Sequence, residues 1–195
     1  MTAQPLKKYS PEEYLELERA AKYKSEYYQG EIFAMAGASR NHNRVVGNLY
    51  VKVGSHLDGE PCDFFPSDMR VHIPANGLYT YPDLTVVCGK EEYLDEEFDT
   101  LLNPKIIIEV LSQGTSGYDR GEKFQLYRSI TTLEEYVLID SKRVAAEVNR
   151  KHPHGFWSLM SEAYSLESSI ELASISLKLP LRDIYGGTEN LGRTE

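Results

Sequence analysis

Cysteine and long apolar runs are both scarce in this chain. Cys62 and Cys88 are the only cysteines in 195 residues, and they form neither a CxxC motif nor a paired framework. Nothing therefore indicates an oxidising compartment, and we expect a cytoplasmic protein. No segment approaches the roughly 18 apolar residues that cross a membrane, and the N-terminus has no apolar stretch after its lysines. We expect neither export nor membrane insertion.

Positive charge is the second deficit. The chain has 21 lysines and arginines against 30 acidic residues, which gives a formal net charge of −9. This balance disfavours the unspecific attraction to phosphates on which basic proteins depend. Any role with nucleic acid must therefore depend on local positive charge or on a bound metal ion. Six acidic residues fall between positions 91 and 99, a run typical of a solvated loop or a surface helix.

Several short catalytic motifs are absent as well. The chain contains no GxSxG, no GxxxxGK[ST] and no GxGxxG, which excludes a nucleophile elbow, a Walker phosphate loop and a dinucleotide-binding turn. His152 and His154 flank a turn without further ligands at suitable spacing, so a zinc site is not expected. The function must come from another group of residues.

What is present indicates a compact α/β mixture. Hydrophobic residues make up 41% of the chain, enough for a core, while 14 glycines and 9 prolines divide it into many short elements. We expect a single domain over residues 1–185 and a disordered tail over 186–195. Expected helices start at Ser10-Pro11, run from Asn41 to about Asp58-Gly59, and run from Asp119 through Arg128. Expected strands lie on both sides of Gln29-Gly30, in PCDFF, MRVHI and YTYPDLTVV, over 105–112, and over 133–140 with a hairpin partner over 142–150.

An acidic residue lies inside the most apolar of these strands. Glu109 is surrounded by branched aliphatic residues over 106–111, and the alternation of a strand puts it on one face with Ile107 and Leu111. An unpaired charge there costs several kcal/mol, so Glu109 needs a cation, a proton or several hydrogen-bond donors. A structural salt bridge in the core is one way to meet that need.

A second acidic residue opens the preceding apolar strand. Asp83 follows Pro82, which cannot donate to a sheet ladder, so its carboxylate could accept backbone hydrogen bonds at the strand end or project into a cleft. If the two strands are neighbours, Asp83 and Glu109 converge, and like charges at close range either share a proton or hold a cation. Ligands that are only oxygens suit Mg²⁺ or Mn²⁺.

Lys123 lies near the start of the helix that follows the Glu109 strand. It could form an i,i+4 pair with Asp119, which is worth only about 0.2–0.5 kcal/mol. Alternatively, its ammonium group could reach back over the sheet to the two carboxylates. There it could orient an attacking water molecule and balance the charge of a pentavalent phosphate. The residues alone leave both interpretations open.

The order of these segments resembles a known nuclease pattern. A strand that opens with Pro-Asp, a strand that carries Glu and a following helix resemble the PD-(D/E)xK nuclease superfamily. The segments YYQGEIFAMAGASRNHNRVVGNL, IIIEVLSQGTSGYDRGEKFQLYR and EEYVLID resemble the Uma-type putative restriction endonuclease family, over roughly residues 9–185. This resemblance implies a restriction-endonuclease-like fold, in which helices flank a mixed β-sheet, here with additional hairpins near both ends of the chain. The activity it implies is metal-dependent hydrolysis of DNA by an endonuclease.

The resemblance also assigns roles to residues. It implies that Asp83 and Glu109 bind Mg²⁺, with Mn²⁺ as an alternative and the carbonyl of Val110 as a further ligand. The chain departs from the superfamily pattern at Leu111, which stands where Glu-x-Lys would place a lysine. Lys123, supplied from the next helix, is the candidate for the role of that lysine.

Two further residues belong to the expected site. Glu31, at the start of the strand before the long helix, is the candidate for the additional acidic residue found in many such sites. His42, in the first turn of that helix, is expected to reach the cleft. The alternatives are an exposed strand glutamate and a histidine that merely sits at a helix terminus.

Three hypotheses about function follow. The first is a metal-dependent endonuclease that acts on DNA, which the resemblance implies to be a homodimer because the two strands of a duplex need two sites. The second is a catalytically inactive binding or regulatory module that keeps the nuclease fold, since fold does not determine function and an acidic surface is unfavourable for DNA. The third is a structural protein in which Lys123 and Glu109 form an ion pair without a metal.

Overall fold

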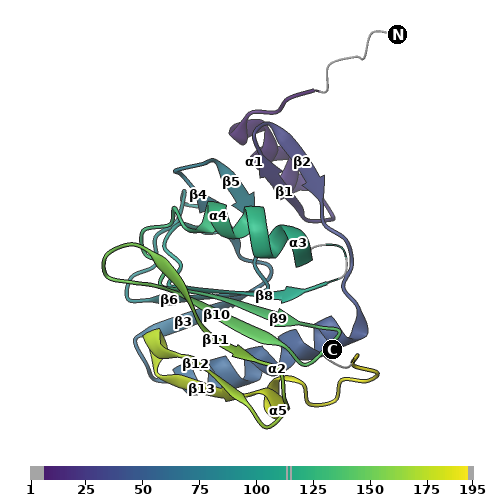
Figure 1. The fold of residues 1–195 in the computed structure, drawn as a ribbon. Coiled ribbons are helices and arrows are strands. Elements are labelled where there is room, and N and C mark those ends of the chain that lie inside the picture. Colours follow the sequence, from purple (N-terminus) through teal and green to yellow (C-terminus); the bar gives the residue numbers. More distant parts are fainter. Residues whose placement is uncertain (1–6, 113, 115, 193–195) are drawn as a thin grey trace.

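The computed structural model describes residues 7–112, 114 and 116–192, and its centre is a mixed sheet in the order β11-β10-β9-β8-β6-β3 (Figure 1). Strands β8 and β9 are parallel, and the other neighbouring pairs of this sheet are antiparallel. The strands that carry the two candidate carboxylates are therefore neighbours. The strands span β3 (Cys62–Pro66), β6 (Leu84–Cys88), β8 (Ile106–Leu111), β9 (Glu135–Asp140), β10 (Ala146–Lys151) and β11 (Trp157–Ala163).

A second sheet, in the order β2-β1-β5-β4-β7, lies over one face of the central sheet (Figure 1). Buried side chains from both sheets and from the helical stretch 116–127 form one apolar cluster between them. The hairpin β1–β2 turns at Gln29 and Gly30, which both have positive φ, as the sequence predicts. These strands are β1 (Ser25–Tyr28), β2 (Glu31–Ala34), β4 (Arg70–Ile73), β5 (Leu78–Thr80) and β7 (Thr100–Leu101).

Helix α2 (Arg40–Leu57), the hairpin β12–β13 and helix α5 cover the opposite face of the central sheet (Figure 1). The apolar residues of α2 that recur at helical spacing are all buried against the sheet, which confirms the predicted helix: Val45, Val46, Leu49, Val53 and Leu57. In the described part of the chain, no helix is both long and apolar enough to span a bilayer. The remaining elements are α1 (Pro11–Ala20), β12 (Ser169–Leu172), η2 (Ala173–Ile175), β13 (Leu177–Pro180) and α5 (Leu181–Ile184).

Helix α1 starts where the sequence predicts. The Ser10 side chain accepts a hydrogen bond from the backbone of Glu13, and the Glu13 side chain accepts one from the backbone of Ser10. This reciprocal capping box, with Pro11 at the first helical position, fixes the start of the helix.

The helical stretch after the Glu109 strand starts three residues earlier than predicted and is not regular. It consists of α3 (Ser116–Tyr118), one π-helical turn η1 (Asp119–Lys123) and α4 (Phe124–Tyr127). Single π-turns are rare and often occur at functional sites. Asp119 and Lys123 lie four positions apart in this turn and form an ion pair, and both are buried.

The acidic run over 91–99 forms a loop, as expected, but part of it is ion-paired. Asp95 and Asp99 form ion pairs with Arg19 at the end of α1. Asp99 also pairs with Arg70 of β4, whose side chain is 3% exposed. The loop therefore joins α1 to the second sheet instead of being only solvated.

We expect Asp99→Asn to reduce stability at neutral pH and to have little effect in acid. Arg19 lowers the pKa of Asp99 well below its usual value, and Thr100 and Arg70 add to this against the opposing effect of burial. A carboxyl group whose pKa is lowered by folding stabilises the fold above its unfolded pKa, and that contribution is lost as the pH falls. Urea unfolding of both proteins should show a difference in free energy that shrinks between about pH 5 and pH 2. A difference that does not depend on pH would contradict the expectation.

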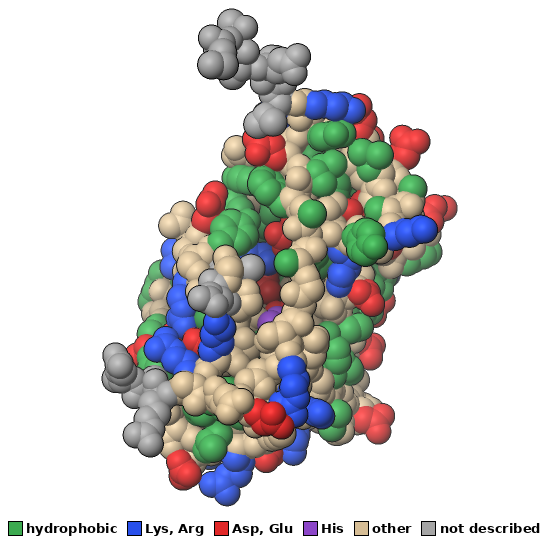
Figure 2. Space-filling view, turned by 90° about the vertical axis from the view of Figure 1, so that its right-hand side faces the viewer, with side chains coloured by type: hydrophobic (Ala, Val, Ile, Leu, Met, Phe, Trp, Pro, Cys, Tyr) green, Lys and Arg blue, Asp and Glu red, His purple; other side chains and the backbone are tan. Residues whose placement is uncertain are grey.

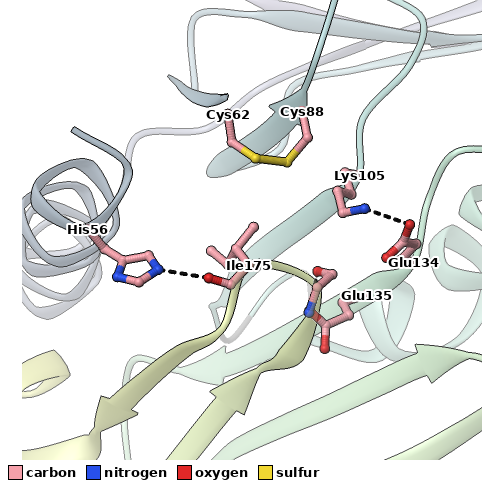
Figure 3. The surroundings of a disulfide bond; sticks show 8 residues. His56, Cys62, Cys88, Lys105, Glu134, Glu135 and Ile175 are labelled. Atoms are coloured by element: carbon pink, nitrogen blue, oxygen red, sulfur yellow. Dashed lines mark hydrogen bonds and ion pairs between the residues drawn. A yellow bond between two sulfur atoms is a disulfide. The ribbon is translucent and has the colours of Figure 1, made fainter. Parts of the chain in front are cut away.

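Cys62 and Cys88 form a disulfide, which the sequence did not predict (Figure 3). The two residues are direct partners in the antiparallel pair β3–β6, with Cα atoms 4.0 Å apart. The register of β3 against β6 brings the two cysteines together. That register cannot be predicted from the positions of two cysteines in the sequence. Figure 3 also shows His56, at the end of α2, donating from Nε2 to the carbonyl oxygen of Ile175 over 2.8 Å. The disulfide, not this hydrogen bond, ties the edge strand β3 to β6, the strand that follows Asp83.

Removal of this disulfide should reduce the free energy of unfolding. The bond joins residues 26 positions apart, and closing a loop of that length stabilises a fold by about 3 kcal/mol. Chemical denaturation should therefore give a lower midpoint for the double variant Cys62→Ala and Cys88→Ala than for the oxidised protein. Addition of dithiothreitol should shift the midpoint of the wild type only. If dithiothreitol shifted the midpoint of the double variant equally, the shift would not be caused by reduction of this disulfide.

Residues 186–192 differ from the expected disordered tail. Glu189 hydrogen-bonds with its backbone to the Asn41 side chain, and its carboxylate pairs with Arg40 over 2.9 Å. The backbone N–H of Gly192 donates to the carbonyl of Lys142 over 2.7 Å. The segment thus runs from the start of α2 to the turn between β9 and β10. The rest of the expected tail, 193–195, lies outside the described residues.

Candidate active site

Asp83 and Glu109 occupy facing positions at one edge of the central sheet. Leu84 pairs with Ile108 across β6 and β8, so the residue before Leu84 lies opposite the residue after Ile108. By strand alternation, Glu109 points to the face that carries Ile107 and Leu111, away from the core of α2. The structure thus brings together the two acidic residues that the sequence singles out.

The Asp83 carboxylate holds the strand end and also reaches a histidine. Its Oδ2 accepts a hydrogen bond from the backbone N–H of Val110 over 2.7 Å, which satisfies that backbone donor at the end of the strand pair. The same oxygen lies 3.3 Å from Nε2 of His42. Both interpretations of Asp83 therefore apply: it satisfies the backbone and it faces the site.

Glu109 is buried and fully engaged. Its side chain is 6% exposed, and its Oε1 accepts a hydrogen bond from the Tyr127 hydroxyl over 2.8 Å and lies 3.0 Å from Nζ of Lys123. Burial raises the pKa of Glu109, and the Asp119 and Asp83 carboxylates raise it further, while Lys123 opposes them. Even with Lys123 beside it, the pKa of this carboxyl group is raised to about 8, so a further cation would favour its ionised form.

Lys123 lies among three carboxylates. Its ammonium nitrogen is 3.0 Å from Glu109, 3.1 Å from Glu26 and 3.8 Å from Asp119, and the side chain is 7% exposed. Burial lowers the pKa of Lys123, but these carboxylates together outweigh burial and raise it well above the usual lysine value. Lys123 therefore stays protonated. It makes the local pair with Asp119 and also reaches Glu109, one of the two carboxylates of the expected site.

The structure does not bring Glu31 to this cluster. Glu31 lies at the turn end of β2, where its carboxylate pairs with Lys8 over 2.8 Å and is 43% exposed. Glu26 of the neighbouring strand contacts Lys123 instead and accepts a hydrogen bond from Thr80. Register places Tyr28 opposite Glu31, so both glutamates point to the same face. Glu26 lies two residues, about 7 Å, further from the turn than Tyr28, the register partner of Glu31. This distance separates the glutamate that contacts Lys123 from the one that does not.

His42 reaches the site, as expected. It lies in the first turn of α2, and its ring faces Asp83. Burial lowers the pKa of His42, but Asp83 and a hydrogen bond with the Val110 backbone outweigh burial, so that the pKa is raised. Among the described residues, nothing accepts or donates a hydrogen bond at its Nδ1. One ring nitrogen thus remains for another group.

The donor set fits a hard cation with few protein ligands. Within residues 7–112, 114 and 116–192, no three side chains of His, Cys, Asp or Glu are placed to hold a metal ion together. Asp83 and Glu109 do offer oxygen ligands next to the backbone of Val110, and Mg²⁺ typically takes one or two carboxylates and keeps several waters. Figure 2 looks onto this edge, where acidic, cationic and histidine side chains lie together in a hollow.

Sequence comparison places the chain among similar proteins. A model of the family Uma2, described as putative restriction endonuclease, matches residues 11–181. Two proteins of Synechocystis sp. (strain ATCC 27184 / PCC 6803 / Kazusa) are 37% identical to the chain, and both are named as uncharacterized. The protein slr1290 matches over 183 residues, 94% of each chain, and sll1609 over 165 residues, 85% of this chain and 93% of that protein.

Structure comparison gives a similar fold. A crystal structure described as a putative nuclease belonging to DUF820, from Anabaena variabilis ATCC 29413, matches with a TM-score of 0.72. The match covers 89% of this chain and 96% of that one at 19% sequence identity. At this identity the likeness concerns the fold, and it agrees with the predicted mixed sheet flanked by helices.

Proposed function

This chain belongs to the Uma2 family of putative restriction endonucleases, and on that premise we propose that it is a metal-dependent endonuclease that hydrolyses phosphodiester bonds of DNA. One observation carries the proposal. Asp83, the residue before β6, lies opposite Glu109 of β8, and Lys123 touches Glu109 from the following helix. This geometry supports the proposal of a PD-(D/E)xK site whose lysine comes from a neighbouring element.

Two carboxylates would hold the metal ion. Asp83 and Glu109, together with the carbonyl of Val110, offer the oxygen ligands that Mg²⁺ or Mn²⁺ prefers. Such an ion, when bound, supplies a Lewis acid for a phosphoryl oxygen and lowers the pKa of water. The Val110 N–H and the Tyr127 hydroxyl each fix one carboxylate, so the ligands are held in place before an ion arrives.

Lys123 would act on the substrate, and His42 would support the metal site. The Lys123 ammonium stays charged, and we propose that it positions the attacking water and stabilises the negative charge that develops on the phosphate. His42, whose Nε2 lies 3.3 Å from Asp83, would hold that carboxylate in place for the metal ion. Glu26 replaces Glu31 as the proposed additional acidic residue, because it contacts Lys123.

We also propose a homodimer in the cytoplasm. Cleavage of both strands of a duplex requires two sites, and each chain contains one candidate site. Light scattering of the purified protein measures its molar mass, and a mass of one chain at all concentrations would remove the dimer. Fractionation of the source cells tests the compartment.

The nuclease proposal predicts that the protein nicks supercoiled plasmid DNA when Mg²⁺ or Mn²⁺ is present. An excess of EDTA should abolish nicking, and renewed Mg²⁺ should restore it, because the carboxylates alone cannot polarise a phosphate. Gel electrophoresis of the plasmid measures the result. Nicking that continues in EDTA would contradict the metal dependence, and the absence of nicking with either ion would contradict the nuclease.

A second candidate is an inactive module that keeps the fold. The observation that favours it is the Lys123 ion pair, which satisfies Glu109 without a metal ion. Calorimetry distinguishes the two candidates, since an inactive module of this kind should not bind Mg²⁺ or Mn²⁺ at millimolar concentration.

A further inference from the structure

Cationic side chains from three segments surround the sheet edge that holds Asp83 and Glu109. Figure 2 shows lysine and arginine side chains on two sides of the hollow at this edge. We call this set the basic rim. It consists of Arg40 and Arg44 in the first turns of α2, Arg120 in η1, and Lys142 and Arg143 in the turn between β9 and β10.

The first part of the rim lies on α2. Arg40 and Arg44 stand one helical turn apart on the exposed face of α2, and His42 between them contacts Asp83 from the opposite face of that helix. The side chain of Arg44 packs against Gly187. Its Cδ and Nε atoms lie 3.5 Å from the position that a Cβ atom would take on this glycine. These two guanidinium groups are therefore carried by the same helical turns that bring His42 to the site.

The second part lies on the helical stretch over the sheet. Arg120 stands three positions before Lys123 and pairs with Glu147 of β10. Leu138 of β9 is the register partner of both Glu147 on β10 and Glu109 on β8. The three side chains therefore lie in one row on the same face of the sheet. Arg120 therefore lies on the same face of the sheet as Glu109, two strands away from it.

The third part lies at the end of β9. Asp140 is the register partner of Leu111, two residues beyond Glu109, and Arg143 pairs with Asp140 over 3.1 Å. The segment 186–192 connects this turn to α2, because it contacts Lys142 at one end and Arg40 at the other. The parts on α2 and on this turn are thus joined at one edge of the sheet.

The rim supplies the local positive charge that the acidic composition makes necessary. Three of its arginines pair with carboxylates: Arg40 with Glu189, Arg120 with Glu147 and Arg143 with Asp140. The acidic run over 91–99 follows the other end of β6, away from Asp83. An exposed ion pair such as that of Arg40 with Glu189 is worth only about 0–1 kcal/mol, so this arginine can exchange a carboxylate for a phosphate at little cost. A guanidinium binds phosphate through two parallel hydrogen bonds.

We propose that the basic rim binds the sugar-phosphate backbone of DNA on both sides of the scissile bond. Arg44 is expected to be the strongest contact, because among the described residues it has no ion-pair partner that competes with phosphate. This inference rests on the proposed nuclease function and adds the residues that hold the substrate. It concerns affinity for phosphates, and it assigns no base contact.

Fluorescence anisotropy with a labelled DNA duplex tests the rim separately from cleavage, because EDTA prevents hydrolysis. We expect Arg44→Glu and Arg143→Glu to weaken binding for every DNA sequence and to reduce the slope of log affinity against log salt by about 1 each. The matched control is Lys178→Glu on the exposed face of β13, which should bind like the wild type. Circular dichroism must show that all variants are folded.

Several results would overturn the proposal. They are equal affinities and salt slopes for the rim and control variants, no binding of any duplex by the wild type between about 50 and 200 mM salt, and binding of RNA with no binding of DNA. The plasmid assay keeps the two proposals apart. If the rim variants lose binding while the wild type does not cleave in Mg²⁺, the result supports DNA binding by the rim and contradicts the nuclease. If the wild type cleaves and the rim variants cleave and bind equally well, the result supports the nuclease and contradicts DNA binding by the rim.

Discussion

Replacement of Lys123 by methionine should lower the free energy of unfolding by about 3–5 kcal/mol. Methionine keeps much of the apolar volume but removes the cation that Glu109, Glu26 and Asp119 share. Three carboxylates would then lie together with no ammonium group between them, and a buried charge that loses its partner is strongly destabilising. Urea unfolding followed by circular dichroism measures the loss.

Two further variants make this result specific. Lys105→Met removes the partly exposed pair with Glu134 and should cost less than about 1 kcal/mol. Glu109→Leu added to Lys123→Met should recover part of the loss, since an apolar pair can replace a buried ion pair. If Lys123→Met is no less stable than Lys105→Met, the ammonium group does not hold the cluster together in solution.

Replacement of Glu109 by glutamine should reduce the rate of plasmid nicking by at least about 10³-fold. Glutamine keeps the shape of the side chain and its hydrogen bond from Tyr127, but it is a neutral and weaker metal ligand. A loss of roughly 4 kcal/mol of transition-state stabilisation corresponds to three orders of magnitude in rate, which is within the contribution of a bound metal ion. Asp83→Asn should have an effect of the same order, since it removes the other carboxylate.

The two glutamates of the first hairpin provide a matched pair for this assay. Glu31→Gln changes a carboxylate that pairs with Lys8 and should nick at the wild-type rate. Glu26→Gln changes the one that contacts Lys123 and should nick more slowly. Nicking rates are measured with excess enzyme at one Mg²⁺ concentration. Equal rates for wild type and Glu109→Gln would remove the assignment of the site.

Local patterns in the sequence predicted most elements of the fold. The five apolar positions of α2 repeat at helical spacing, and each is buried as that spacing requires. The run around Glu109 is apolar on both faces because helices or a second sheet cover both sides of β8. The pair Pro82-Asp83 marks a strand start, and the convergence of Asp83 with Glu109 needed only that their strands be neighbours.

What the sequence did not predict depends on contacts between distant segments. Glu26 and Glu31 have the same charge and point to the same side of one hairpin, and only the position of Lys123 distinguishes them. The disulfide depends on the register of β3 against β6, which no spacing rule contains. The π-turn η1 has no sequence signature that we can name. Residues 186–192 are polar and glycine-rich, yet their hydrogen bonds to α2 and to the β9–β10 turn hold them in place.

The course of that last segment has a practical consequence for the choice of expression vector. Gly192 lies against Lys142 and Arg143, so a purification tag fused behind the C-terminus would begin beside the basic rim. A polyhistidine tag there would place metal-binding imidazoles next to the candidate site, and could compete with it for the ions used in the assays. The first described residues lie beyond α1, far from that edge (Figure 1). We would therefore place a purification tag at the N-terminus for the assays.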